Sequence, residues 1–166
     1  MNYKKWLRSS ISLLFTLLIM STILDVIRRP NVPEQQFSLR YNDIQQEPFF
    51  FAQLNQERPV IIYFWGTWCS ICRYTSPAIQ ALAEEGESVI SVALKSGDEE
   101  KVRSYLAENS YTFRTLNDPN GKISEQWNVS VTPTIVIFNQ GKITFSTTGI
   151  SSYWGLKVRL FLARFF

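Results

Sequence analysis

The two cysteines of the chain, Cys69 and Cys72, are separated only by Ser70 and Ile71. A Cys-x-x-Cys pair at the point where a strand gives way to a helix is typical of a redox site. The amides and dipole of the helix favour a thiolate on the first cysteine, and the second lies within reach to form a disulfide. The pair therefore predicts thiol–disulfide exchange, with Cys69 as the nucleophile and Cys72 as the thiol that resolves the mixed disulfide. Ser70 and Ile71 are expected to tune the redox potential.

Other roles for a cysteine pair fit this sequence less well. A structural zinc site needs about four ligands, and the chain has no histidine and no further cysteine, so we predict no metal site and no cofactor. No Pro-x-x-x-Thr-x-x-Cys arrangement surrounds either cysteine, which disfavours a peroxidase. A purely structural disulfide stays an alternative, although a bridge that closes so short a loop stabilises a fold little.

The pair must be positioned by a strand before it and a helix after it. Residues 60–65 form an apolar run, as expected for a buried central strand. Residues 70–85 have helical character, and Pro77 is expected to kink this helix by removing a backbone donor.

The rest of the chain alternates between strand and helix patterns. One or two short strands are expected within residues 37–54. Further strands are expected at 88–94, 112–116, 134–138 and 142–148, and helices at 98–109, 122–127 and 152–166. Because a hairpin and a last helix follow the alternating part, the sequence predicts an α/β fold with a mixed central sheet flanked by helices.

The beginning of the chain has the composition of a membrane anchor. Three basic residues precede residues 9–27, a stretch of 19 residues in which Asp25 is the only charge. As a helix this stretch would span about 28 Å, close to the thickness of the hydrocarbon core of a bilayer. The basic start favours an N-terminus in the cytoplasm. A cleaved signal peptide is the alternative, although residues 21–25 lack a convincing small-x-small cleavage site.

Both alternatives export the remainder of the chain. We predict one N-terminal transmembrane helix within an anchor at 1–29, a linker at 30–36 and a folded domain at 37–166. The chain would then be a single-pass protein of the inner (cytoplasmic) membrane, with its domain in the periplasm. Five of the 17 basic residues lie in the first 29 positions, which leaves 12 against 13 acidic residues afterwards. The exported part has no basic stripe, so we predict no nucleic-acid partner.

Several residues outside the pair resemble the thioredoxin superfamily. Residues 64–69, Phe-Trp-Gly-Thr-Trp-Cys, look like the approach to a thioredoxin active site. Pro77 matches the helix-kinking proline of the family, and Thr132-Pro133 is similar to its cis-proline segment. Gly141 and Gly149 fall where the family has glycines in and after a hairpin. The resemblance covers residues 37–166 and implies a thioredoxin-like fold.

The resemblance also implies which residues bind the substrate. Pro133 is expected in the cis form against the disulfide, with an ordinary trans turn as the alternative. Thr132 is expected to offer its backbone to an extended substrate. Trp68 is expected to form part of an exposed apolar docking surface, and Trp65 to lie in the core.

Within the superfamily, the anchor and the extra segment 98–129 look like the membrane-anchored TlpA-like group. That group includes reductases of apocytochrome c and the suppressor-of-copper-sensitivity protein D type. Residues 69–77, Cys-Ser-Ile-Cys-Arg-Tyr-Thr-Ser-Pro, look closest to the latter. Tyr63 stands where many thioredoxins have a buried Asp, and Thr75 stands where cytochrome-maturation reductases commonly have Glu. Because both acids would help to move a proton at the second cysteine, their absence disfavours the cytochrome role.

The sequence therefore predicts a membrane-anchored protein disulfide oxidoreductase. Its expected partners are exported cysteine-containing proteins, a membrane thiol–disulfide electron carrier, and the membrane itself through the N-terminal helix. Two alternatives are a cytochrome c maturation thiol reductase of the same fold and a noncatalytic thioredoxin-fold binding module with a structural disulfide.

The last helix carries apolar residues that can share one side, namely Trp154, Leu156, Leu160, Phe161 and Phe165. We expect this side to cover the sheet. Contact of the helix with the membrane interface is the alternative.

Overall fold

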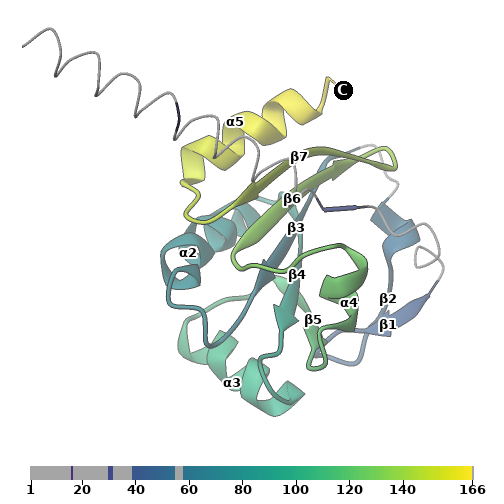
Figure 1. The fold of residues 1–166 in the computed structure, drawn as a ribbon, viewed down its shortest axis with the longest axis vertical. Coiled ribbons are helices and arrows are strands. Elements are labelled where there is room, and N and C mark those ends of the chain that lie inside the picture. The colour runs from purple at the N-terminus through teal and green to yellow at the C-terminus, as the bar shows by residue number, and fades with distance from the viewer. Residues whose placement is uncertain (1–15, 17–29, 32–38, 55–57, 166) are drawn as a thin grey trace, which may run out of the picture.

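A five-stranded mixed sheet forms the centre of the computed structural model, which describes Thr16 and residues 30–31, 39–54 and 58–165 (Figure 1). The strand order is β5-β4-β3-β6-β7. The strands are β3 (Val60–Trp65), β4 (Ser88–Leu94), β5 (Arg114–Asp118), β6 (Thr134–Asn139) and β7 (Lys142–Thr148). β3, β4 and β5 are parallel, whereas β6 and β7 run antiparallel to their neighbours. The predicted mixed-sheet α/β fold is confirmed.

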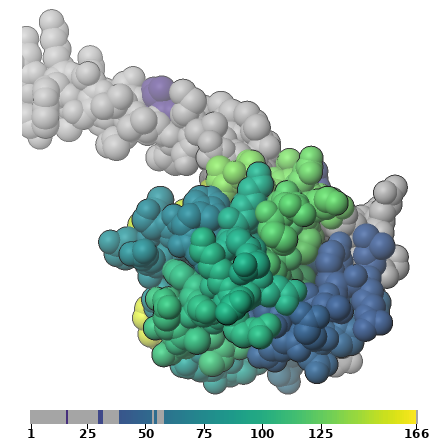
Figure 2. Space-filling view, turned by 90° about the horizontal axis from the view of Figure 1, so that it is seen from below, coloured from purple at the N-terminus to yellow at the C-terminus, as the bar shows by residue number. Residues whose placement is uncertain are grey.

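Helices cover one face of the sheet and a mixture of elements covers the other. The first face carries α2 (Cys72–Glu84), α3 (Glu99–Glu108) and α5 (Tyr153–Ala163). The second carries β1 (Arg40–Asn42), β2 (Pro48–Phe50), the 3₁₀ helix η2 (Phe51–Leu54) and α4 (Lys122–Gln126). In Figure 2 the blue surface of residues 40–54 and the blue-green surface of α2 lie on opposite sides of the molecule.

Alternation along β3 explains how both faces are filled. Successive side chains of a strand point to opposite faces, and all six residues of β3 are buried. Ile61, Tyr63 and Trp65 pack under the helices, which confirms the core position predicted for Trp65. Their neighbours Val60, Ile62 and Phe64 pack under the second layer.

The short strands expected within residues 37–54 form an antiparallel hairpin, β1–β2. A partly buried ion pair fixes this hairpin to the edge of the sheet, because Nε of Arg114 in β5 lies 2.7 Å from Oδ2 of Asp43. The 3₁₀ helix that follows adds Phe51 to the second core, where its ring lies 5.2 Å from that of Trp127.

One predicted strand is displaced by two residues. The sequence favours a strand at 112–116, whereas β5 spans Arg114–Asp118. The amide of Thr112 donates instead to Oε1 of Gln80 in α2, at 2.8 Å. A side chain of the neighbouring helix thus takes the hydrogen bond of Thr112, and the sheet ladder begins at Arg114 opposite Ile90.

The prediction that one side of the last helix carries all its large apolar residues is wrong. Leu156 and Leu160 are buried against the sheet, whereas Trp154, Phe161 and Phe165 are exposed. At about 100° per residue, positions 156 and 160 lie on the opposite side of a helix from the other three. The helix is apolar on both sides, and the sheet covers one of them.

The anchor predicted at 1–29 lies outside the described residues, apart from Thr16. No helix in the described part of the chain combines the length and apolar character needed to cross a membrane. Of the predicted linker 30–36, two residues are described. Pro30 is buried, and the amide of Asn31 donates to the carbonyl oxygen of Trp127 at 3.0 Å. The chain is thus held on the domain at residues 30–31.

Candidate active site

Cys69 and Cys72 lie between the end of β3 and the start of α2, and a disulfide joins them with their Cα atoms 5.3 Å apart. Cys72 is completely buried, whereas Cys69 is 6% exposed. The intervening Ser70 and Ile71 are exposed. Cys69 is therefore the less buried residue of the pair, and the roles predicted for the two cysteines stay predictions.

The start of α2 provides a hydrogen-bond donor to the Cys69 sulfur. The amide of Cys72 lies 3.2 Å from Sγ of Cys69. After reduction, this amide and the positive end of the helix dipole would favour the thiolate over the thiol at Cys69. The geometry thus supports Cys69 as the nucleophile.

The loop before the pair is anchored to the end of β4. The amide of Thr67 donates to Oγ of Ser96 at 3.0 Å, and Nε1 of Trp68 donates to the carbonyl oxygen of Leu94 at 2.9 Å. The indole of Trp68 lies over Gly66, where a Cβ atom would be 2.6 Å from Nε1. Trp68 is held in place while 58% of it remains exposed beside Cys69. The structure thus shows Trp68 exposed, and its role in docking a substrate stays a prediction.

Four exposed apolar side chains, Trp68, Ile71, Tyr74 and Ile150, form what we call the apolar rim of the site. Of these four, sequence reasoning placed only Trp68 on an exposed apolar surface; Ile71 was expected to tune the redox potential, and its exposure was missed. Tyr74 follows Ile71 by three residues, a helical spacing that could have identified it. Ile150 had no such signal, because the next residue is brought to α2 by a long-range contact, in which the amide of Ser151 reaches Oγ1 of Thr75 at 3.4 Å.

The Thr132–Pro133 peptide bond is cis, as predicted. It directly precedes β6, whose first residue, Thr134, pairs with Phe64 of β3. The cis bond therefore lies near the end of β3 that leads to the cysteines. The carbonyl oxygen of Pro133 accepts a hydrogen bond of 2.9 Å from the amide of Gly149, which has a φ of 83°. Among the described residues, nothing engages the backbone of Thr132. Its amide and carbonyl groups are available to an extended peptide.

Neutral hydroxyl groups occupy the positions at which related proteins have acids. The hydroxyl of Tyr63 lies 2.8 Å from Oγ of Ser76, and both residues are buried. Burial raises the pKa of Tyr63 well above its usual value, so the phenol stays protonated. Thr75 is buried against Ser151. Within the described chain, neither cysteine has a hydrogen bond to a carboxylate, and no group of three or more acids or cysteines could hold a metal ion.

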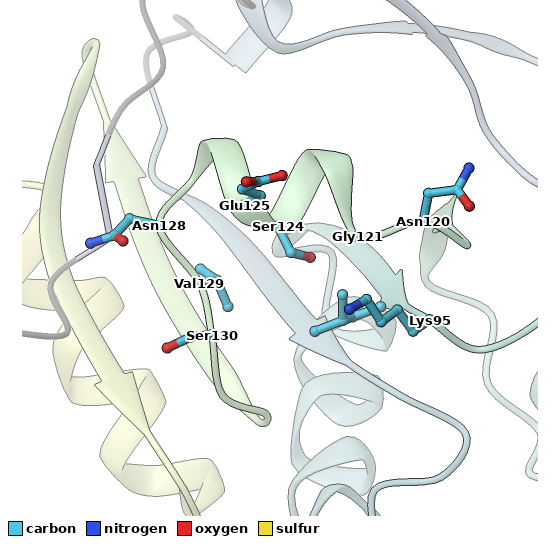
Figure 3. Close-up of a pocket in the computed structure, with 9 residues that line it drawn as sticks. Lys95, Asn120, Gly121, Ser124, Glu125, Asn128, Val129 and Ser130 are labelled. Carbon is cyan, nitrogen blue, oxygen red and sulfur yellow. The ribbon is translucent and has the colours of Figure 1, made fainter.

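Two surface pockets are found in the described part of the chain, and the first of them lies beside the pair. The first, of about 570 Å³, is lined by Thr67, Trp68, Arg73, Lys101, Tyr105, Glu108 and Asn109. The second, of about 450 Å³, is lined by Leu94, Lys95, Asn120, Gly121, Ser124, Glu125, Asn128, Val129 and Ser130 (Figure 3). In Figure 3, α4 and the loop after it form one wall of the second pocket, and Lys95 at the end of β4 lies opposite. A polypeptide docked at Thr132 would meet this polar wall.

Comparison with known proteins assigns the family. The sequence model described as the AhpC/TSA family matches residues 31–146. The chain belongs to this family. A "Thioredoxin-like protein" of Haemophilus influenzae is 52% identical over 166 residues, which cover 100% of this chain and 99% of that protein. The prediction of the thioredoxin superfamily is confirmed.

Two more proteins that resemble this AhpC/TSA protein share less sequence identity with it. The "Thiol-disulfide oxidoreductase ResA" of Oceanobacillus iheyensis is 26% identical over 139 residues, which cover 76% of this chain and 71% of that protein. A secreted Mycobacterium tuberculosis disulfide oxidoreductase has a crystal structure with a TM-score of 0.67 at 22% identity, over 78% of this chain and 98% of that chain. This likeness confirms the thioredoxin-like fold. The prediction of a thiol–disulfide oxidoreductase is confirmed at the level of the family.

Proposed function

We propose that this AhpC/TSA-family protein is a membrane-anchored periplasmic oxidoreductase that exchanges disulfides with exported cysteine-containing proteins through Cys69 and Cys72. One observation carries the proposal. The disulfide joins Cys69, which is 6% exposed, to the completely buried Cys72, whose amide donates to the Cys69 sulfur. An accessible thiolate backed by a buried partner is the arrangement that thiol–disulfide exchange requires.

In the reductive direction, the Cys69 thiolate attacks one sulfur of a partner disulfide. A new S–S bond joins Cys69 to the partner, and the other sulfur of the partner leaves as a thiolate. The Cys72 thiol loses its proton and attacks Cys69, which closes the Cys69–Cys72 disulfide and releases the second partner thiolate. Two electrons have then passed from the enzyme to the partner. The same steps in reverse oxidise a dithiol.

Each turnover leaves the pair in the opposite redox state, so a second partner must restore it. A membrane thiol–disulfide carrier would do so for a domain anchored at the inner membrane and facing the periplasm. The apolar residues 9–27 and the basic residues before them support this location. The motif at residues 69–77 supports the suppressor-of-copper-sensitivity protein D type within the TlpA-like group.

Two other functions receive less support from the site. A cytochrome c maturation reductase would have an acid near Cys72, and the structure places the neutral residues Thr75 and Tyr63 at the two positions concerned. A noncatalytic module with a structural disulfide needs no accessible sulfur, whereas Cys69 lies beside the apolar rim and the free backbone of Thr132.

Reduction of insulin by the purified full chain tests the proposal. With dithiothreitol supplied to reduce the pair again after each cycle, we expect turnover by the wild-type chain and by the surface control Ser104→Ala, and none by Cys69→Ala. Cys72→Ala should accumulate a mixed disulfide with the substrate, because the resolving thiol is absent. Full turnover by Cys69→Ala would contradict the mechanism.

A further inference from the structure

The side of α5 that faces away from the sheet is apolar along its whole length. We call this side the outer face of α5. It consists of Trp154 (73% exposed), Val158 (57%), Phe161 (57%), Leu162 (40%) and Phe165 (71%). At about 100° per residue these five side chains fall within an arc of about 100°. Figure 1 shows α5 at the border of the molecule, with no described element on its outer side.

A helix with large apolar side chains on two opposite sides normally has both of these sides covered. The domain covers α5 only through Leu156, Leu160 and Ala163. The exposed side chains are contiguous, since the rings of Phe161 and Phe165 are 5.1 Å apart and follow Trp154 at helical spacing. A contiguous exposed patch of large apolar side chains marks an interaction site.

The charges around the outer face favour a phospholipid surface. Residues 152–166 contain three basic residues and no acidic residue. Lys157 and Arg164 lie along one border of the face, where they pair with Glu85 and Glu87 of the α2 end. Arg159 lies along the other border. Basic residues on the flanks with Trp and Phe between them are typical of helices that lie in a membrane interface.

The first fixed residues of the domain lie close in sequence to the proposed membrane anchor. Pro30 is buried and Asn31 is bonded to Trp127. Only residues 28–29 separate this fixed point from the apolar stretch 9–27. This step rests on the anchor of the proposed function. With so short a connection, an anchored domain lies directly on the membrane and cannot stand away from it.

From these observations we propose that the outer face of α5 lies in the interface of a phospholipid bilayer. Trp154, Phe161 and Phe165 insert between headgroups and upper acyl chains. Arg159, which has no carboxylate partner among the described residues, faces the anionic headgroups. Ile150, which is also exposed, precedes α5 and belongs to the apolar rim of the active site. The contact therefore holds the redox pair close to the membrane surface.

Photo-cross-linking of the full chain in bacterial membranes tests this contact. p-Benzoylphenylalanine is placed at Phe161 and, as the matched control, at Ser104, which is exposed on α3. We expect phospholipid adducts at position 161 and not at position 104. Equal lipid yields at both positions would overturn the proposal. So would adducts at position 161 that contain a second copy of the chain or another protein in place of lipid.

A charge variant separates this contact from the other parts of the proposed function. With the cross-linker at Trp154, the double variant Phe161→Glu/Phe165→Glu should lose its lipid adducts but keep its melting temperature and insulin reduction, because the replaced side chains are exposed. Undiminished adducts would overturn the proposal. A Cys69→Ala chain should keep its adducts, since the contact requires no redox chemistry.

Carbonate extraction distinguishes the contact from the anchor. Lipid adducts at position 161 in a chain that carbonate strips from the membrane would refute the anchor and support the α5 contact. No adducts in a chain that resists carbonate would support the anchor and refute the contact.

Discussion

Cys69 and Cys72 share one loop and one bond, yet solvent reaches only one of them. The fold achieves this by ending the exposed loop at Ile71 and starting α2 at Cys72, whose side chain then points into the core. The Cys72 amide is therefore placed to act on the Cys69 sulfur. The start of α2 at Cys72 therefore has two effects. It buries Cys72 while Cys69 stays partly exposed, and it places an amide donor at the Cys69 sulfur.

Tyr63 and Ser76 form a buried neutral pair below the site. Tyr63→Phe should lower the free energy of unfolding by about 1 kcal/mol, because Ser76 loses a partner. The pH midpoint of Cys69 alkylation by iodoacetamide should not move, because burial raises the pKa of Tyr63 and keeps it uncharged. Ser76→Ala serves as the control. A displaced midpoint in Tyr63→Phe would show that the phenol takes part in proton transfer.

Gly66 is the residue that allows Trp68 to lie flat beside Cys69. In Gly66→Ala the new Cβ would meet the indole at 2.6 Å and the carbonyl oxygen of Leu94 at 3.2 Å. The indole must swing outward and lose its hydrogen bond to Leu94, at a cost of about 1 kcal/mol. Denaturant unfolding followed by tryptophan fluorescence measures both effects. Trp68→Phe, which removes the same bond without crowding, is the control, and an unchanged spectrum of Gly66→Ala would contradict this account.

At the level of elements, α5 is attached to the end of α2 through Glu85. Both Lys157 and the Tyr153 hydroxyl donate to its carboxylate. Two hydrogen bonds lower the pKa of Glu85. The bond from Lys157 has the larger effect and the bond from Tyr153 the smaller. Because the folded pKa is lower than the unfolded one, the stabilisation is present above the unfolded pKa. It is lost as the pH falls through the folded pKa.

The consequence is an acid-dependent part of stability that belongs to this contact. Between about pH 5 and about pH 3, the wild-type melting temperature should fall more steeply than that of Glu85→Gln. Added salt should reduce the difference, because the groups are exposed. Glu100→Gln, an exposed acid on α3, provides the control. Parallel curves for the wild type and Glu85→Gln would show that the contact contributes nothing.

Elements with a single strong pattern were predictable from the sequence, and elements set by their neighbours were not. The predicted strands at 60–65 and 88–94 matched β3 and β4 to the residue, because buried strands are rich in apolar residues. The start of β5 depends on Gln80, a residue 32 positions before Thr112. No local pattern contains that information.

The same reasoning explains the outcome at the site. Cys69, Cys72 and Pro133 carry signals in their own types and spacing, and each has the position that the sequence indicated. Ile150 joins the apolar rim only because Gly149 and Ser151 bond to distant residues. The face of α5 was ambiguous because a helix that is apolar all round gives no preferred side.

At the scale of the whole molecule, the backbone tie at Asn31 fixes where the preceding chain leaves the domain. Asn31→Pro removes the amide that donates to Trp127 and should lower the free energy of unfolding by about 1 kcal/mol. Asn31→Ala keeps the amide and is the matched control. Urea unfolding of both full-length variants measures the difference. Equal stabilities of the two variants would show that the hydrogen bond from Asn31 to Trp127 contributes nothing to the free energy of unfolding.

The loop of residues 149–151 contacts both halves of the site. Gly149 holds the carbonyl of Pro133, next to the backbone that can receive a polypeptide, and Ser151 reaches Thr75 in the helix that begins with Cys72. One loop of three residues therefore supports both the cis-proline segment, where a polypeptide can dock, and the helix that carries Cys72 of the redox pair.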